Sequence, residues 1–195
     1  MIRVFDIVIS SIVITIMSPI FVMIALLITF SSGWPFVFRQ KRVGLHGKDF
    51  KIIKFRTMRK NSEKTGQLTI GNRDSRVTPI GYYLRKYKLD EFPQFLNVII
   101  GQMSIVGPRP EVRKYADLYN KEQLRALSIR PGITDDATIR FRNENQIMVS
   151  YTNPEEAYIK EILPYKLRLS YVWIKNPSFF NYFRIIWETF KALFK

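Results

Sequence analysis

The 195-residue sequence lacks cysteine altogether, contains a single histidine and has few acidic side chains. The absence of cysteine excludes a disulfide scaffold, a thiolate metal cluster and a cysteine nucleophile. A single histidine excludes His-rich metal sites and argues against a Ser-His-Asp catalytic triad. Any catalytic chemistry must therefore come from carboxylates, arginines and lysines.

Positive charge dominates, because 31 Lys and Arg residues face 16 Asp and Glu residues, for a formal net charge of +15. Hydrophobic residues make up 47% of the chain, which is too many for a disordered basic tail. The length suggests about one domain. We therefore expect a compact basic protein with an anionic partner: nucleic acid, an anionic membrane surface or a phosphorylated substrate.

Residues 7–30 form an apolar run without a charged side chain. As a helix this run would be about 36 Å long, enough to cross a bilayer. The residues that follow lack the cleavage pattern of a signal peptide. Ser18-Pro19 predicts a kink near the middle. Basic residues on both flanks favour one cytoplasmic side for both ends, as in a re-entrant helix, but the residues alone leave a kinked crossing helix open.

The segment 36–58 predicts a β-hairpin, because aromatic or branched residues alternate with basic ones around the turn Gly44-Leu45-His46-Gly47. Between Arg39 and Lys60 there are nine basic residues and one acidic residue, a pattern that suits either lipid headgroups or substrate phosphates. Residues 61–79 are polar and rich in turn formers, which predicts a loop.

The C-terminal segment predicts an amphipathic helix over about 178–194. Its apolar stripe consists of Phe179, Phe183, Ile186, Trp187, Phe190, Leu193 and Phe194. Such a stripe suits either packing in the core or an interfacial position on a membrane, and both interpretations stay open.

Asp90-Glu91 is the pair of residues that most suggests chemistry. We expect Asp90 to cap a helix that Gly101 ends, where the helix dipole favours the ionised form of both carboxylates. An ionised aspartate can attack phosphorus, and a neighbouring glutamate can hold Mg²⁺. Most such pairs only cap solvated helices, but Arg85 and Arg109, the latter between two prolines, supply counter-charges that match phosphate oxygens.

Four motifs occur in order along the chain. They are Lys54-Phe55-Arg56-Thr57-Met58, Arg76-Val77-Thr78-Pro79-Ile80-Gly81, Leu89-Asp90-Glu91-Phe92-Pro93-Gln94 and Met103-Ser104-Ile105-Val106-Gly107-Pro108-Arg109-Pro110. Together with the apolar N-terminal segment, they closely resemble the bacterial sugar transferase family, the monotopic phosphoglycosyl transferases or polyprenyl-phosphate hexose-1-phosphate transferases. The resemblance runs to about Thr134.

The resemblance implies an enzyme that moves a sugar-1-phosphate from a UDP-sugar to undecaprenyl phosphate, releases UMP and starts a bacterial surface glycan such as capsule, lipopolysaccharide O-antigen or exopolysaccharide. It implies that Asp90 is the nucleophile that forms a covalent aspartyl phosphosugar, and that Glu91 is the ligand of a Mg²⁺ cofactor. Arg85 and Arg109 are carried over as substrate-binding residues, and Lys54 and Arg56 are assigned to phosphate or nucleotide contact.

The resemblance also implies an α/β fold, mostly helical with a small β-hairpin, in a monotopic protein of the bacterial inner membrane. Residues 1–32 would form a re-entrant helix broken at Ser18-Pro19. Residues 33–195 would form a catalytic domain on the cytoplasmic face, with membrane-interface helices. The implied partners are the UDP-sugar, undecaprenyl phosphate and membrane lipids, without nucleic acid, and a homo-oligomer stays open. Because no transmembrane helix precedes the domain, we expect the minimal catalytic form.

The chain departs from the family pattern after Thr134, where many members continue with glycine and then Gln-Val. Here the residues are Asp135-Asp136-Ala137-Thr138-Ile139, and we expect this region to shape the donor pocket and leave the sugar open. Two rival hypotheses remain. One is a single-step transfer in which Asp90 only positions magnesium. The other is a non-catalytic basic protein that binds a membrane surface or nucleic acid.

Overall fold

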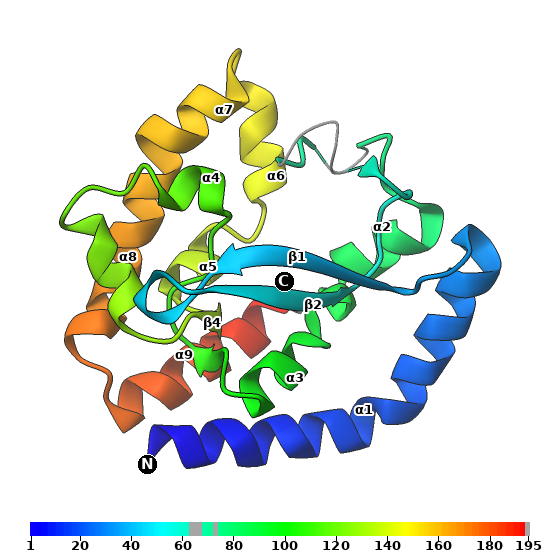
Figure 1. Cartoon of the computed structure of the whole chain (residues 1–195), viewed down its shortest axis with the longest axis horizontal. Coiled ribbons are helices and arrows are strands. Elements are labelled where there is room, and N and C mark those ends of the chain that lie inside the picture. Colours follow the sequence, from blue (N-terminus) through cyan, green and yellow to red (C-terminus); the bar gives the residue numbers. More distant parts are fainter. Residues whose placement is uncertain (63–67, 72–73, 194–195) are drawn as a thin grey trace.

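The computed structural model describes residues 1–62, 68–71 and 74–193 (Figure 1). Its α-helices are α1 (Ile2–Ser32), α2 (Pro79–Lys86), α3 (Gln94–Ile99), α4 (Arg113–Ala116), α5 (Asp136–Arg140), α6 (Glu144–Ile147), α7 (Pro154–Ala157), α8 (Leu163–Lys175) and α9 (Phe179–Leu193). Its strands are β1 (Val37–Val43), β2 (Asp49–Phe55), β3 (Ser104–Val106) and β4 (Gly132–Thr134). Shorter turns are η1 (Leu45–Gly47), η3 (Leu89–Glu91), η4 (Gln123–Ser128), η5 (Met148–Ser150) and the π-helical η6 (Tyr158–Ile162). Residues 63–67 and 72–73 of the predicted loop, and residue 194 of the predicted C-terminal helix, lie outside the described residues.

The mostly helical fold with a small hairpin is confirmed. β1 and β2 pair antiparallel, with Val37 opposite Phe55 and Val43 opposite Asp49, around a turn that exposes His46. A parallel pair, β3 and β4, was not predicted from the sequence. Beside this strand pair, the backbones of Gly107 and Gly132 lie very close together. A Cβ atom on Gly132 would lie only 2.1 Å from the Gly107 nitrogen. Only glycine can stand at this position.

α1 is a single bent helix. It runs without interruption from Ile2 to Ser32 through Pro19, and Figure 1 shows it changing direction along its length. Ser18 Oγ donates a hydrogen bond to the Thr15 carbonyl at 2.8 Å, which satisfies a backbone group next to the proline. The predicted kink is confirmed, whereas the predicted break into two helices is wrong.

The N-terminal end of α1 is fixed to the body by polar contacts. The buried Asp6 carboxylate accepts hydrogen bonds from Ser104 Oγ at 2.8 Å, the Ile105 nitrogen at 3.0 Å and the Tyr182 hydroxyl at 2.9 Å. Arg3 donates to the Val98 carbonyl at 2.6 Å. This end of the helix therefore joins β3, α3 and α9.

The C-terminal end of α1 is fixed to the same body. Ile24 and Ile28 are buried with Phe55 of β2 and Leu84 of α2. Between the two ends, apolar side chains of α1 are exposed: Val8, Ile12, Ile16, Ile20, Val22 and Met23. α1 is long and apolar enough to cross a membrane, but it contacts one body at both of its ends.

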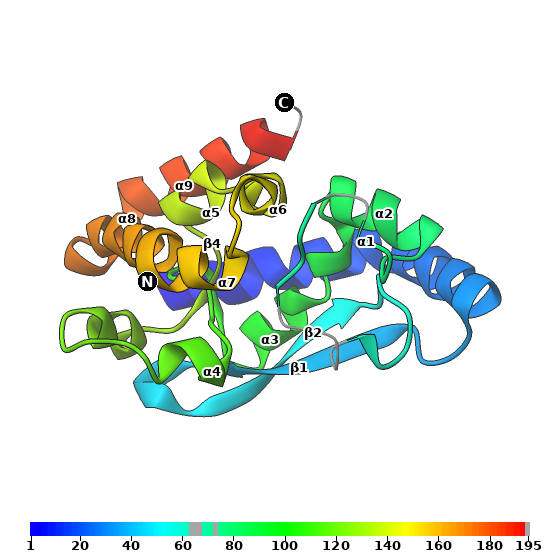
Figure 2. The same ribbon diagram turned by 90° about the horizontal axis from the view of Figure 1, so that it is seen from above.

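α9 buries a different face from the predicted stripe. Tyr182 and Ile185 are fully buried. The aromatic side chains of the stripe are largely exposed: Phe179, Phe183, Trp187 and Phe190. Phe5 of α1 contacts two of these rings, with centroids 5.0 and 5.8 Å apart. Figure 2 shows α9 and the hairpin on opposite sides of the body. The exposed aromatic face favours the interfacial interpretation.

Candidate active site

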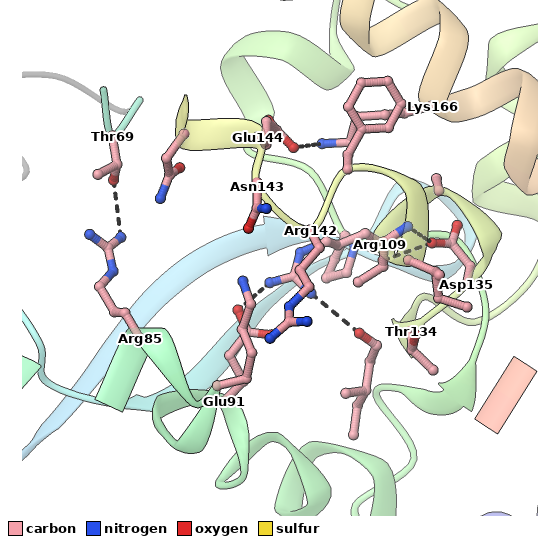
Figure 3. Close-up of a pocket in the computed structure, with 18 of the residues that line it drawn as sticks. Thr69, Arg85, Glu91, Arg109, Thr134, Asp135, Arg142, Asn143, Glu144 and Lys166 are labelled. Atoms are coloured by element: carbon pink, nitrogen blue, oxygen red, sulfur yellow. Dashed lines mark hydrogen bonds and ion pairs between the residues drawn. The ribbon is translucent and has the colours of Figure 1, made fainter. Parts of the chain in front are cut away.

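A cavity of about 560 Å³ lies between the η3 turn, strand β2 and the segment that carries α5 and α6 (Figure 3). This volume is within the range of small-molecule sites in proteins. The structure brings together most of the residues that the sequence predicted, since the cavity is lined by Lys54, Arg85, Asp90, Glu91 and Arg109.

The backbone around the dyad forms a tight turn ahead of α3. Lys88 adopts a left-handed conformation with φ of 56°, and η3 follows it directly. α3 begins only at Gln94, after Pro93, and Asp90 makes no capping hydrogen bond. The predicted capping role of Asp90 is therefore wrong. Proline suits the start of a helix because it needs no hydrogen-bond acceptor, so the helix forms after it rather than around the dyad.

Asp90 is a buried carboxyl group, 6% exposed. Its Oδ1 atom has no hydrogen-bond partner among the described residues. Burial, reinforced by the negative charge of Glu91, raises the pKa of Asp90 to about 6, although Lys54 and Arg85 act in the opposite direction. The expectation that the ionised form of Asp90 is favoured is therefore wrong, because burial raises its pKa. A carboxyl group with this pKa is still mostly ionised at neutral pH and is more basic than an ordinary aspartate.

Glu91 is held by two cations. Its Oε1 atom accepts a hydrogen bond from Lys54 Nζ at 2.9 Å and another from the Arg109 guanidinium. Burial alone would raise the pKa of Glu91, but Arg109 and Lys54 hold it well below its usual value. Glu91 is therefore ionised throughout the physiological pH range, and its position is set by its two partners.

The loop after β3 orients Arg109. Pro108 and Pro110 flank the residue, and the Pro108 carbonyl accepts a hydrogen bond from the Gly132 nitrogen at 2.9 Å. Arg109 Nη1 donates to the Ile133 carbonyl at 3.2 Å. Burial opposes the charge of Arg109, but Glu91 raises its pKa above the usual value. The guanidinium is thus fully charged and faces the dyad.

Lys54 is oriented through α3. The buried Asn97 of this helix accepts a hydrogen bond from the Ile53 nitrogen at 2.9 Å and donates to the Lys51 carbonyl at 2.8 Å. These bonds fix the end of β2 against the helix that follows the dyad. Burial lowers the pKa of Lys54, while Glu91 acts in the opposite direction.

Arg85 and Arg109 lie on opposite sides of Glu91 in Figure 3. Arg85 donates a hydrogen bond to Thr69 Oγ1 at 3.0 Å. Burial lowers the pKa of Arg85, and Asp90 raises it. The segment that contains Thr69 therefore contributes to the cavity, which the sequence did not predict.

Arg56 was assigned to phosphate or nucleotide contact, and the structure does not bring it to the cavity. Its Nη2 atom donates hydrogen bonds to the Ser32 carbonyl at 2.9 Å and to the Gly33 carbonyl. The side chain is buried at the end of α1. Arg56 therefore fixes the end of α1 to the body, and its contact with phosphate or nucleotide stays a prediction.

The wall opposite η3 comes from the region that departs from the family pattern. Arg142, Asn143 and Glu144 line the cavity, and Glu144 forms an ion pair with Lys166 of α8 at 2.8 Å. Figure 3 shows Asn143 and Glu144 on the other side of the cavity from Glu91. In the sequence, this wall is marked by the polar run Arg142-Asn143-Glu144-Asn145. The run lines the cavity, which agrees with the expectation that the region after Thr134 shapes the donor pocket.

The dyad fits a single Mg²⁺ ion that is shared with a substrate, and does not fit a closed metal site. No group of three or more metal-binding side chains occurs among the residues that the structure describes. Mg²⁺ usually takes one or two carboxylates and completes its shell with water and substrate phosphates. The Glu91 carboxylate, which lines the cavity next to Asp90, provides one such ligand.

Comparisons with known proteins give a consistent result. The model of the family described as "Bacterial sugar transferase" matches residues 1–195. The chain is 35% identical over 96% of its length to the UDP-N-acetylgalactosamine-undecaprenyl-phosphate N-acetylgalactosaminephosphotransferase of Aeromonas hydrophila, and covers 42% of that protein. It is 43% identical over 75% of its length to the UDP-glucose:undecaprenyl-phosphate glucose-1-phosphate transferase of Klebsiella pneumoniae, and covers 32% of it.

A third relative is similar in length to the chain. The exopolysaccharide production protein ExoY of Rhizobium meliloti is 32% identical over 98% of the chain, and the chain covers 84% of it. In contrast, the chain spans less than half of the other two relatives. The names of those two relatives specify different sugars.

Proposed function

The chain belongs to the bacterial sugar transferase family, and we propose that it transfers a sugar-1-phosphate from a UDP-sugar to undecaprenyl phosphate. Relatives with this activity in their names support the proposal. A cavity lined by cations around a buried carboxylate is the arrangement that a diphosphate substrate needs. The product would be a lipid-linked diphosphate sugar, the first intermediate of a surface glycan.

The transfer proceeds in two displacements at the phosphorus that carries the sugar. An Asp90 carboxylate oxygen attacks this β-phosphorus, the bond to the oxygen shared with the α-phosphorus breaks, and UMP leaves with the electron pair. A phosphate oxygen of undecaprenyl phosphate then attacks the same phosphorus. The bond to Asp90 breaks, and the carboxylate is regenerated as the lipid diphosphate sugar forms.

The surrounding residues have separate roles in these steps. Lys54 and Arg109 hold Glu91, and their cationic groups lie where the charge of a diphosphate would develop. Arg85 supplies a further positive charge that acts on Asp90. A magnesium ion on Glu91, when bound, would neutralise part of the diphosphate charge.

The single observation that carries this proposal is the Asp90 side chain. A buried carboxylate oxygen without a partner in the described part of the chain is costly unless the site uses it. Its raised pKa suits a nucleophile. In the single-step hypothesis the same atom would only position magnesium, so the covalent adduct distinguishes the two mechanisms.

The proposed location is the cytoplasmic face of the bacterial inner membrane. The apolar side chains of α1 are exposed between two ends that are held by one body, which supports a helix that enters and leaves the lipid on the same side. The exposed aromatic face of α9 suits the same interface.

Replacement of Asp90 by asparagine tests the function. UMP release would be measured with a panel of UDP-sugars in the presence of undecaprenyl phosphate and Mg²⁺. We expect Asp90→Asn to lower turnover by about a thousandfold or more without loss of membrane binding. Asp117→Asn, at an exposed aspartate, serves as the control and should retain wild-type turnover.

Two outcomes would contradict the proposal. If the wild-type protein releases UMP from none of the UDP-sugars, the enzymatic function fails and the non-catalytic rival gains support. If turnover requires Asp90 but mass spectrometry of a single turnover without acceptor finds no sugar-phosphate adduct, the single-step mechanism is favoured instead.

A further inference from the structure

A second hollow, an apolar groove of about 810 Å³, lies between α1 and α9. We call it the apolar groove, and its apolar walls are formed by Ile9, Val13, Leu89, Phe92, Phe95, Ile105, Ile133, Ile186, Phe190 and Leu193. Ile9 and Val13 belong to the N-terminal half of α1, whose neighbouring residues Val8 and Ile12 are exposed apolar side chains. The groove therefore begins at the surface that we expect to meet lipid.

The apolar groove meets the catalytic cavity. Phe92, Thr134 and Arg142 line both hollows. Leu89, immediately before Asp90, and Phe92, immediately after Glu91, are part of the groove wall. A molecule that lies in the groove therefore ends at the dyad.

Two cations stand where the groove and the cavity meet, Lys86 and Arg142. Neither has an ion-pair partner within the described ranges. Arg142 Nη2 donates a hydrogen bond to the Leu193 carbonyl at 3.3 Å. In contrast, Lys54 and Arg109 are already bound to Glu91. Arg142 is therefore available to a second anionic ligand.

We propose that the apolar groove binds the isoprenoid chain of the phosphorylated lipid acceptor and that Arg142 binds its phosphate. This inference rests on the proposed function, because it assigns a place to one of its two substrates. The charge arrangement identifies the occupant. The cations among the groove's described lining residues, Lys86 and Arg142, lie where it meets the cavity, which matches a single hydrocarbon chain with a terminal phosphate. A guanidinium can hold two phosphate oxygens while a third faces Asp90.

Steady-state kinetics with separate variation of the two substrates tests the role of Arg142. We expect Arg142→Gln to lower kcat/KM for undecaprenyl phosphate about tenfold or more, while kcat/KM for the UDP-sugar changes by less than about twofold. Arg142→Lys, which retains the charge, should recover part of the loss. If Arg142→Gln lowers kcat/KM for the UDP-sugar instead, or lowers neither, the assignment of Arg142 to the acceptor is wrong.

A pair of neighbouring substitutions on α1 tests the groove. Val13→Trp places a large side chain in the groove, whereas Ile12→Trp places it on the exposed side of the helix, where Ile12 is 51% exposed. We expect the first variant to lower kcat/KM for undecaprenyl phosphate and the second to match the wild type. Equal kinetics for both variants would overturn the placement of the chain.

The rise in Tm on ligand binding tests the groove without relying on turnover, so it can fail or succeed independently of the catalytic proposal. Undecaprenyl phosphate should raise the Tm of the detergent-solubilised wild type and of Ile12→Trp, and should raise those of Val13→Trp and Arg142→Gln less. Inorganic phosphate and phosphatidic acid are the comparison ligands. Equal stabilisation by either of them would contradict an isoprenoid site. Stabilisation by undecaprenyl phosphate without UMP release from any UDP-sugar would support the groove and refute the proposed function.

Discussion

Replacement of Asp6 by alanine tests whether the N-terminal end of α1 is held by the body. The Asp6 carboxylate is 2% exposed and accepts hydrogen bonds from Ser104, Ile105 and Tyr182. Hydrogen bonds to a charged group are worth about 1.5–3 kcal/mol each, and water that enters the vacated space recovers part of this. We expect Asp6→Ala to lower the free energy of unfolding by about 4 kcal/mol.

For a chain of this length, such a loss corresponds to about 8–16 °C in Tm, measured by thermal unfolding in detergent. Asp49→Ala is the matched control, because Asp49 pairs with Arg113 on the surface and its side chain is 44% exposed. The control should cost less than about 1 kcal/mol. Both variants should be compared with the wild type at the same detergent and salt concentration.

Tyr182→Phe removes one of the three donors to Asp6, and alone should cost about 1–2 kcal/mol. In the double variant the two losses should not add, and a coupling of about 1–2 kcal/mol should remain. A Tm for Asp6→Ala within about 2 °C of the wild type, together with no coupling, would mean that the first turns of α1 do not contact β3 and α9. The argument that both ends of α1 meet one body would then fail.

Two further predictions concern the framework around the site. Gly132→Ala should lower the free energy of unfolding by about 2–3 kcal/mol and lower UMP release, because the new Cβ atom would displace the Gly107 backbone and with it the loop of Arg109; a wild-type Tm and activity would refute the close contact. Asp74→Asn tests a pH dependence of stability. The hydrogen bonds from Arg76 hold the pKa of Asp74 below its usual value in the folded protein. The ionised Asp74 therefore stabilises the fold above its pKa in the unfolded chain, and this contribution is lost as the pH falls through its pKa in the folded protein. The Tm difference between wild type and Asp74→Asn should therefore be clear at about pH 6 and should shrink as the pH falls below the ordinary aspartate pKa of about 3.9. A difference that is independent of pH would contradict this.

The grouping of the dyad with its cations was predictable from the sequence, because a pair of carboxylates in a basic chain needs counter-charges close by. The hairpin was predictable from its alternating residues, which brought Lys54 to the site. The same alternation could not predict the position of the Arg56 side chain. Two residues apart on a strand, Lys54 and Arg56 would share a face, but β2 ends at Phe55 and the alternation ends with it.

Other features depend on tertiary contacts that no local pattern contains. α9 carries apolar residues on two faces, and its periodicity cannot indicate that Tyr182 and Ile185, rather than the aromatic stripe, meet the core. Asp6 lies just before the uncharged run and shows no sign of its partners, which are about a hundred or more residues away in the sequence. The cavity wall that contains Arg142 was visible in the sequence only as a departure from the family pattern. Its position in the cavity could be found only from the folded structure.

The attachment of both ends of α1 to one body has a consequence for how the protein tolerates different membranes. A helix that crosses a bilayer must match the hydrophobic thickness between two interfaces, and mismatch makes it tilt or deforms the lipid. In the proposed location, the bent α1, which contains Pro19, returns to its own body and meets a single interface, so its depth would be set by its bend and by the contacts of Asp6 and Arg56. The distance between the dyad and the headgroups would then stay constant when acyl chains lengthen or shorten.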